Sequence, residues 1–434
     1  MSTRFVNIDR DTPMLLPPDL RDWVQQDDLV HFLVDALMLL DLSAATVNAR
    51  GTGSEQYPPG MLLGLLIYCY ANGLFSSRQI ERATYQNLSV RYLAANTHPD
   101  HDTIAKFRRE NAALLRSAFV QLLQLARQAG LLKLGALALD GTKLEANAAK
   151  RKTLTTAQVE EELCRLEQRV SELLHRAEAA DQSGSTEDAL PTELADVQAR
   201  RARLRQAQAQ LQRQAQARHA QREVQRRERP PGDKPRPVAH EPRSTDTINP
   251  TDPDSTLTPT ARQRYIQGYN AQLAVSTRDT GLIVAADVVR DTNDLQQLEP
   301  MVEQAIENGY LPAQVLVDTG YENVRQILSV ETRHGLTVLC PPAQIANARP
   351  GVVPRSPWRR QRKELRAQLR LRLQSPVAKA FYALRAITVE PAFGIIKSVL
   401  GFRRFSLRGL DKVRTEWTLL SLAFNCRRLA AHWA

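Results

Sequence analysis

Cysteine is scarce in this chain, and its spacing excludes two classes of small stabilised protein. Among 434 residues there are only four cysteines, far apart and without a CxxC pair: Cys69, Cys164, Cys340 and Cys426. This pattern fits neither a disulfide framework nor a cysteine-rich zinc site. It is typical of a protein in a reducing compartment, so we expect a cytoplasmic location.

Long hydrophobic runs are also missing. The longest uncharged stretch, residues 57–77, has an apolar core of only Met61 to Ala71. A membrane-spanning helix needs about 20 consecutive apolar residues. The N-terminal residues mix charged and polar types where a signal peptide would carry an apolar run. We therefore expect a buried helix at residues 57–77 and no membrane partner.

Aromatic residues are absent from residues 151–240, so this segment cannot build a globular core. Its apolar residues instead recur at the 3, 4 and 7 spacings of helices that pair along their length: Leu163, Leu166, Val170 and Leu173, then Val197, Leu204 and Leu211. With a turn at residues 181–188, this predicts an inserted helical hairpin with helices at 155–180 and 191–229. The second arm is basic from Arg200 onward. The proline-rich chain from 230 to 259 is expected to be loop.

The positive charge is concentrated in one stretch. The chain has 58 Lys and Arg against 47 Asp and Glu, a net charge of +11. Residues 341–380 contain ten basic residues, Arg359 and Arg360 among them, and one acid, Glu364. Such an excess is typical of a surface that binds a polyanion. The alternative is a solvated helix face or a basic linker.

The first 130 residues are expected to be helical. The pattern predicts helices from Leu29 to Leu40 and from Ser76 to Gln86, and a long helix from Asp102 to Gly130. The long helix carries Lys106, Arg108 and Arg109 in its first turns. A bundle of this kind suits DNA docking, although the same pattern fits a domain that only packs or dimerises.

Strands alternate with helices in the remainder of the chain, which indicates a mixed α/β sheet. The first predicted strand, residues 134–140, precedes the hairpin. The later elements are strands at 269–276 and 282–289, a helix at 294–308, a strand at 314–318, a helix at 323–334 and a strand at 336–339. The hairpin therefore interrupts one α/β domain. We expect three parts: an N-terminal domain at 1–130, an α/β domain at 131–150 and 241–434, and the insertion with its linker at 151–240.

Three carboxylates occupy informative places in this layout. Asp140 and Asp318 are each expected to end a strand, and each is followed by Gly within two residues. Glu390 lies beside Pro391, near the start of a helix whose buried face is Phe393, Ile396 and Leu400. The strand ends of an α/β sheet converge on a crevice, and carboxylates without His or Cys select Mg²⁺ or Mn²⁺. A single strand-end Asp, by contrast, is commonly a turn former or helix cap.

Several motifs give the chain a resemblance to a known family. They are LDGTKLEAN at 139–147, YNAQLAV from Tyr269, VDTGY at 317–321, and the stretch from Val389 to Trp417, in which Lys397 follows Glu390 by seven positions. The chain resembles bacterial insertion-sequence transposases of the DDE class, in the subgroup with a helical N-terminal domain and a ribonuclease H-like catalytic domain. Tyr382 and Arg385 match the family signature in mutual spacing, but four residues rather than three separate Arg385 from Glu390.

The resemblance implies a fold, a site and a reaction. It implies that Asp140, Asp318 and Glu390 bind two Mg²⁺ or Mn²⁺ ions and that the protein cleaves element ends and joins the 3′-hydroxyl to target DNA. Its partners would be double-stranded DNA, as terminal inverted repeats and target, and a second copy in the paired-end complex, at the bacterial nucleoid. The residues expected to contact DNA are Lys397, Arg385, Tyr382, Arg403, Arg404, Arg359, Arg360, Lys106, Arg108 and Arg109. The alternatives are a transposase-derived DNA-binding protein without catalysis, a metal-dependent nuclease, and a coiled-coil interaction protein.

Overall fold

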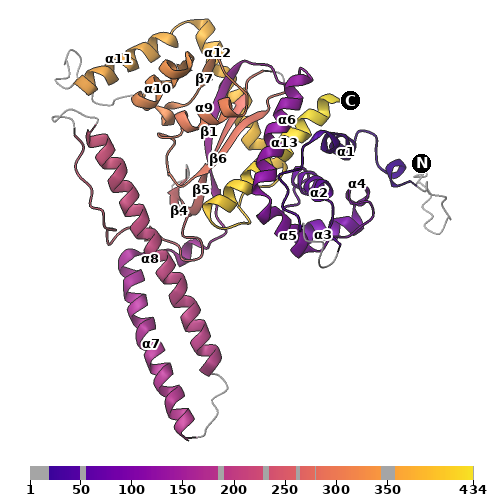
Figure 1. Cartoon of the computed structure of the whole chain (residues 1–434). Coiled ribbons are helices and arrows are strands. Elements are labelled where there is room, and N and C mark those ends of the chain that lie inside the picture. Colours follow the sequence, from indigo (N-terminus) through magenta and orange to yellow (C-terminus); the bar gives the residue numbers. More distant parts are fainter. Residues whose placement is uncertain are drawn as a thin grey trace, which may run out of the picture.

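A computed structural model describes residues 19–48, 55–183, 190–227, 234–260, 264–278, 280–343 and 357–433. The N-terminal part is helical and lies to one side of a sheet (Figure 1). Its helices are α1 (Leu29–Leu39), α2 (Pro59–Ala71), α3 (Ser77–Gln86), α4 (Leu88–Leu93), α5 (His101–Glu110) and α6 (Ala112–Gln128). Among the described residues, no helix is both long enough and apolar enough to span a bilayer.

Two predictions for this part have clear outcomes. The capped start at Ser76 is confirmed, because Ser76 and Gln79 form a capping box. The single long helix from Asp102 to Gly130 is wrong, because the chain breaks at Asn111, between α5 and α6. There the side chain of Asn111 donates to the carbonyl of Phe107 and accepts the backbone N–H of Thr46. These bonds compete with the regular helical ladder.

The sheet is mixed, as expected. Its strands are β1 (Ala136–Glu145), β4 (Thr256–Pro259), β5 (Tyr265–Ser276), β6 (Ile283–Val289), β7 (Gln314–Leu316) and β8 (Thr337–Leu339). β1 lies at the centre, antiparallel to β5 and parallel to β7. Beyond them, β8 pairs with β7, while β4 and β6 both pair with β5. A second, two-stranded sheet joins β2 (Leu154–Thr155) to β3 (Thr247–Ile248).

Two expectations about the strands are wrong. The first strand does not end at Asp140, because its pairing with β5 continues to Glu145, opposite Gly268. The proline-rich segment 230–259 is not all loop, since β3 and β4 lie within it. In both cases the long-range partner decides the conformation rather than the local sequence.

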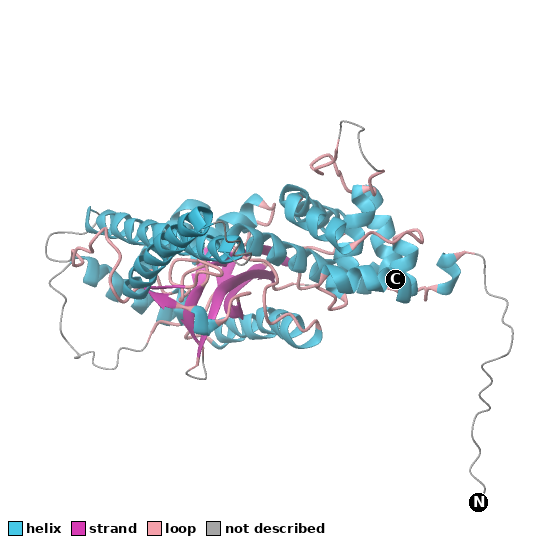
Figure 2. Ribbon diagram, turned by 90° about the horizontal axis from the view of Figure 1, so that it is seen from below, coloured by secondary structure: helices cyan, strands magenta, loops and turns pink. Residues whose placement is uncertain are grey.

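Helices cover both faces of the sheet (Figure 2). They are α9 (Leu298–Glu307), α10 (Val324–His334), α11 (Pro357–Arg372), α12 (Pro376–Gly394) and α13 (Leu410–Trp433). α13 packs against α2 and α6 on one side and β6 on the other. One continuous hydrophobic core therefore joins the N-terminal helices to the sheet.

The segment between β2 and β3 forms two long helices that project from the sheet, α7 (Thr156–Ser183) and α8 (Leu190–Arg227) (Figure 1). They pack on each other through a small core of their own that includes Leu163, Leu204 and Leu211. Ion pairs also cross between them, from Glu162 to Arg200 and from Arg169 to Glu193. The later residue of α7 pairs with the earlier residue of α8, so the two helices run antiparallel. The expected turn at 181–188 lies partly outside the described residues, and its first three residues belong to α7.

Candidate functional site

Asp140 and Asp318 lie side by side because of the register between two parallel strands. Ala136 pairs with Gln314 and Ala138 with Leu316, and β7 then ends. Asp140 lies two residues after Ala138 and is still within β1. Asp318 lies two residues after Leu316. Asp318 also caps the short 3₁₀ turn that follows, accepting the N–H of Gly320 at 2.9 Å. The helix-cap interpretation of Asp318 is therefore confirmed, and its Oδ2 atom is left for a second contact.

Helix α12 brings the third carboxylate to the same place. It packs against β1 and β5 and carries Glu390 near its C-terminal end. The expectation that Glu390 lies near the start of a helix is wrong, because α12 begins at Pro376 and Pro391 lies inside it. The face predicted to be buried is confirmed, since Phe393, Ile396 and Leu400 are all at most 7% exposed.

Arg385 of α12 lies among all three carboxylates. Its Nη1 atom is 3.5 Å from Oδ2 of Asp140 and 3.8 Å from Oε1 of Glu390, and its Nη2 atom is 3.9 Å from Oδ2 of Asp318. The guanidinium is mostly buried, 14% exposed. Tyr382, one turn earlier, donates its hydroxyl to the carbonyl of Val317 at 3.0 Å. Both family-signature residues therefore belong to the wall of the acidic site.

The environment shifts the protonation of Asp140. Burial raises its pKa from 3.8 to about 6, and the charges of Asp318 and Asp294 push in the same direction. Arg385 and the N–H of Gly141, which donates to Asp140 at 2.9 Å, act in the opposite direction. A buried carboxylate with like charges beside it is a group that a cation would stabilise.

The chemical type of the three side chains suits a hard divalent cation. The three side chains offer only carboxylate oxygens and converge on a single positive group, the guanidinium of Arg385. As they stand, no three acidic, His or Cys side chains of the described residues are close enough together to hold a metal ion. The guanidinium lies between the carboxylates, so a metal ion would need Arg385 to move aside.

A fourth carboxylate, Asp294, borders the site. Its Oδ1 accepts from Asn270 at 2.7 Å and from Gln272 at 2.6 Å. A Cβ atom on Gly141 would lie 2.4 Å from this oxygen and 2.3 Å from Nε2 of Gln272, so a larger residue would have to displace both side chains. The sequence did not single out Asp294 as a member of this site. The signal that could have found it is the acid-rich turn after β6, because the end of β6 lies beside β5 and hence near β1.

Lys397 also lies at the site. The helix widens into a π-helical turn at Ile395–Val399, and Lys397 in this turn donates to Oγ1 of Thr142 on β1. Burial lowers the pKa of Lys397, while Asp140 raises it. The next loop carries two exposed arginines: Arg403 donates to the carbonyl of Lys397, and Arg404 donates to the carbonyl of Ala146.

The basic stretch of residues 341–380 is divided between structure and surface. Arg366 is buried and lies 2.5 Å from Glu322, and Arg372 pairs with Glu331, so these two residues fasten α11 to the sheet domain. Arg359 and Arg360 are exposed on the same helix. Residues 344–356 and the side chain of Trp358 lie outside the described residues.

In the N-terminal domain one expected DNA contact is wrong. Arg108 is 6% exposed and donates to the hydroxyl of Tyr70 at 2.7 Å and to the carbonyl of Phe75 at 3.0 Å. It therefore stabilises the interior and cannot reach a phosphate. Lys106 and Arg109 are exposed on α5.

Two protein-family models match the chain. The model described as "Transposase domain (DUF772)" matches residues 18–110, and the model described as "Transposase DDE domain" matches residues 247–426. The chain belongs to the insertion-sequence DDE transposases. In this transposase Asp318 and Glu390 lie inside the DDE match, whereas Asp140 lies before it and is brought to them by the pairing of β1 with β7. The helical N-terminal region and mixed sheet are consistent with a ribonuclease H-like DDE fold. No curated protein and no solved structure gives a significant match.

Proposed function

We propose that this transposase binds the terminal inverted repeats of a mobile DNA element, cleaves the phosphodiester bonds at the element ends and joins the freed 3′-hydroxyl to target DNA. The observation that carries the proposal is the convergence of Asp140, Asp318 and Glu390, from three separate segments, on the single cation Arg385. The alternative of a coiled-coil interaction protein does not account for this convergence.

Asp140, Asp318 and Glu390 would hold two divalent ions, Mg²⁺ or Mn²⁺. Such ions, when bound, supply activation of the attacking oxygen and stabilisation of the leaving one in phosphodiester chemistry. The role of the protein is to hold the three negative charges at fixed positions. β1 fixes Asp140, the 3₁₀ turn fixes Asp318, and α12 fixes Glu390.

Cationic side chains around the triad would hold the DNA strand. Lys397 lies over Thr142, two residues from Asp140 on β1, and is suited to hold a phosphate beside the scissile bond. Arg403 and Arg404 extend the positive charge along the next loop, and Arg359 and Arg360 add to it from α11. Lys106 and Arg109 on α5 would contact the inverted repeat. Cleavage at two paired ends implies a homodimer in the active complex.

The test is cleavage of duplex DNA carrying the natural flanks of this gene, with Mg²⁺ or Mn²⁺. Three proteins are compared: wild type, Asp318→Asn, and Asp196→Asn, an exposed residue of α8. We expect wild type and Asp196→Asn to nick at one fixed position near the inverted repeat and to yield joined products. Asp318→Asn should bind the DNA without cutting it.

Other outcomes separate the rival functions. Cutting by Asp318→Asn would refute the assignment of the triad. Binding by the wild type without any cut in either metal would favour a transposase-derived DNA-binding protein, and cutting without joining or site preference would favour a nuclease.

A further inference from the structure

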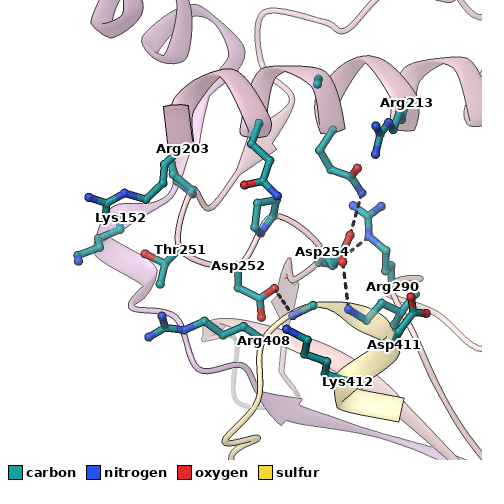
Figure 3. Close-up of a pocket in the computed structure, with 17 residues that line it drawn as sticks. Lys152, Arg203, Arg213, Thr251, Asp252, Asp254, Arg290, Arg408, Asp411 and Lys412 are labelled. Atoms are coloured by element: carbon teal, nitrogen blue, oxygen red, sulfur yellow. Dashed lines mark hydrogen bonds between the residues drawn. The ribbon is translucent and has the colours of Figure 1, made fainter. Parts of the chain in front are cut away.

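A broad groove lies at the base of the helix pair, where α8 meets the loop at 250–254 and the start of α13 (Figure 3). Its volume is about 900 Å³, and neither family match assigns it a role. Five exposed cations line it from four segments: Lys152 before β2, Arg203 and Arg213 on α8, Arg408 in the loop before α13, and Lys412 in α13. In Figure 3, α8 runs along one side and Arg408 and Lys412 lie opposite.

Three acids also line the groove, Asp252, Asp254 and Asp411, and the first two are engaged by neutral groups. Asp252 accepts the hydroxyl of Tyr269 at 2.8 Å and the N–H of Gly409 at 3.1 Å. Asp254 accepts Gln210 of α8 at 2.8 Å and the N–H of Leu410 at 3.0 Å. Both carboxylates are therefore used to join α8 and the start of α13 to the loop between them, and they already cap the N-terminus of α13.

Two of the five cations are held by backbone carbonyls. Arg408 donates to the carbonyl of Asn147 at 2.9 Å, and Arg203 donates to the carbonyl of Ala199 at 3.3 Å. Within the described residues, none of the five lining cations forms a salt bridge. The five exposed cations and Arg290 outnumber the three carboxylates of the groove, so this concave surface has a net positive charge that favours a polyanion.

The arrangement suits an elongated ligand rather than a single phosphate. Arg203 and Arg213 are ten residues apart on α8, about 15 Å along the helix axis. The groove continues into a second hollow that shares Lys152 and Arg203 with it and also contains Arg200. A small anion would use one end of such a surface, whereas a nucleic-acid backbone would contact all of it.

Contacts lead from this groove to the acidic site. Arg403 donates to the carbonyl of Lys397, and Arg404 and Arg408 both bond to Asn147. Asn147 in turn donates to the carbonyl of Ser406 at 2.7 Å. The loop 403–408 thus lies against the chain that leaves β1 and carries positive charge from Lys397 to the groove.

We infer that the groove binds the backbone of the duplex DNA whose end lies in the acidic site, so that the base of the inserted helix pair acts as a DNA clamp. This inference rests on the proposed function. It gives the insertion a role at its base, where α8 contributes cations. The contact between groove and DNA would not depend on base sequence, because arginine and lysine would bind phosphates.

The test measures binding of the flanking duplex by fluorescence anisotropy in EDTA at several salt concentrations, so that catalysis plays no part. Arg203→Gln/Arg213→Gln is compared with wild type and with a control, Arg165→Gln/Arg205→Gln, which removes two exposed arginines outside the groove. The slope of log K against log salt is negative, and each lost phosphate contact should reduce its magnitude by about 0.9. Each such loss should also weaken binding roughly eightfold at about 0.1 M salt. A scrambled duplex of equal length should show the same fold-loss.

The outcomes distinguish this inference from the proposed function. A groove variant with the affinity and salt slope of the wild type overturns the clamp, even if cleavage proceeds, and leaves a partner such as an acidic protein for this surface. An equal loss in the control variant also overturns it, because the effect would then be general charge. Loss confined to the groove variant supports the clamp, even where the wild type fails to cut and the proposed chemistry is refuted. A wild type that binds no DNA refutes both.

Discussion

Nη1 of Arg385 lies 3.5 Å from Oδ2 of Asp140, and the same guanidinium also faces Asp318 and Glu390. Arg385 therefore balances carboxylates that would otherwise repel one another in a partly buried place. It also occupies the space toward which a metal ion would be drawn. Arg385 thus stabilises the metal-free protein and at the same time lowers its affinity for a metal ion.

Replacing Arg385 with Gln should separate these two effects. Without metal, the variant should lose about 1–3 kcal/mol of unfolding free energy, because three carboxylates lose their shared cation; their partial exposure keeps the loss below that of a fully buried pair. Adding Mn²⁺ should raise the melting temperature of the variant more than that of the wild type. Thermal unfolding followed by circular dichroism measures both quantities.

The control for this prediction is Arg333→Gln, which breaks pairs with Glu299 and Glu303, two acids that do not belong to the triad. Its response to Mn²⁺ should equal that of the wild type. If Mn²⁺ stabilises Arg385→Gln no more than the wild type, Arg385 does not compete with the metal ion.

A buried polar chain joins the N-terminal helices to the C-terminal helix. The hydroxyl of Tyr70 accepts from Arg108 at 2.7 Å and donates to Glu416 at 3.3 Å. Glu416 is fully buried and also accepts the N–H groups of Ser406 and Leu407. Tyr70→Phe removes the bridging hydroxyl and should cost about 1–3 kcal/mol, because two buried charged groups each lose a partner.

Urea unfolding measures the cost of Tyr70→Phe against a matched substitution. Tyr85 is 57% exposed, and Tyr85→Phe should change stability by less than about 0.5 kcal/mol. Equal stability of the two variants would mean that water or a rearranged Arg108 replaces the hydroxyl without loss.

The sequence alone predicted most of the sheet domain. β5, β6, α9, β7, α10 and β8 all lie where the period of apolar residues and the turn signals placed them. Asp318 and Glu390 were chosen as candidates from the residues next to them in the chain, and their role stays a prediction. These features depend on local pattern, and local pattern is what a single sequence shows.

The errors arose where a distant partner decides the structure. β1 continues past Asp140 because β5 offers pairing as far as Glu145. Arg108 stands in a basic run, but the hydroxyl of Tyr70 holds it inside. Pro391 resembled a helix start, yet α12 simply passes through it, and the position of Arg385 among the acids followed only from that longer helix.

The ion pair between Arg218 of α8 and Asp246 gives a prediction about pH. The hydrogen bond from Arg218 is the main cause that lowers the pKa of Asp246 below 3.8. An acid whose pKa is lowered by folding stabilises the folded state above its unfolded pKa, and this stabilisation is lost as pH falls through the folded pKa. Asp246→Asn should therefore cost about 1 kcal/mol at pH 7, and the same at pH 5.

Urea titrations at pH 7, 5 and 3.5 measure this difference between wild type and Asp246→Asn. The gap in unfolding free energy should begin to narrow only below about pH 5, as the unfolded carboxyl takes up its proton. A gap that already narrows between pH 7 and pH 5 would contradict the lowered pKa.

The outer part of the helix pair should be dispensable for folding. α8 is joined to the rest of the molecule by Gln210, which bonds Asp254, and by Arg218, which bonds Asp246. Further out, ion pairs join the two helices to each other, from Glu162 to Arg200 and from Arg169 to Glu193. Replacing residues 167–197 with a short Gly and Ser linker should therefore leave the melting temperature within a few degrees of the wild type, because both the main core and the inner seam remain.

The shortened protein also tests where the insertion acts. The groove cations Arg203 and Arg213 remain in it, so binding to the flanking duplex should keep the wild-type salt slope. A folded protein with a reduced slope would place DNA contacts in the outer arms instead of the base. Aggregation of the shortened protein would mean that the outer arms cover apolar surface of the main core, contrary to the separate seam that Leu163, Leu204 and Leu211 form.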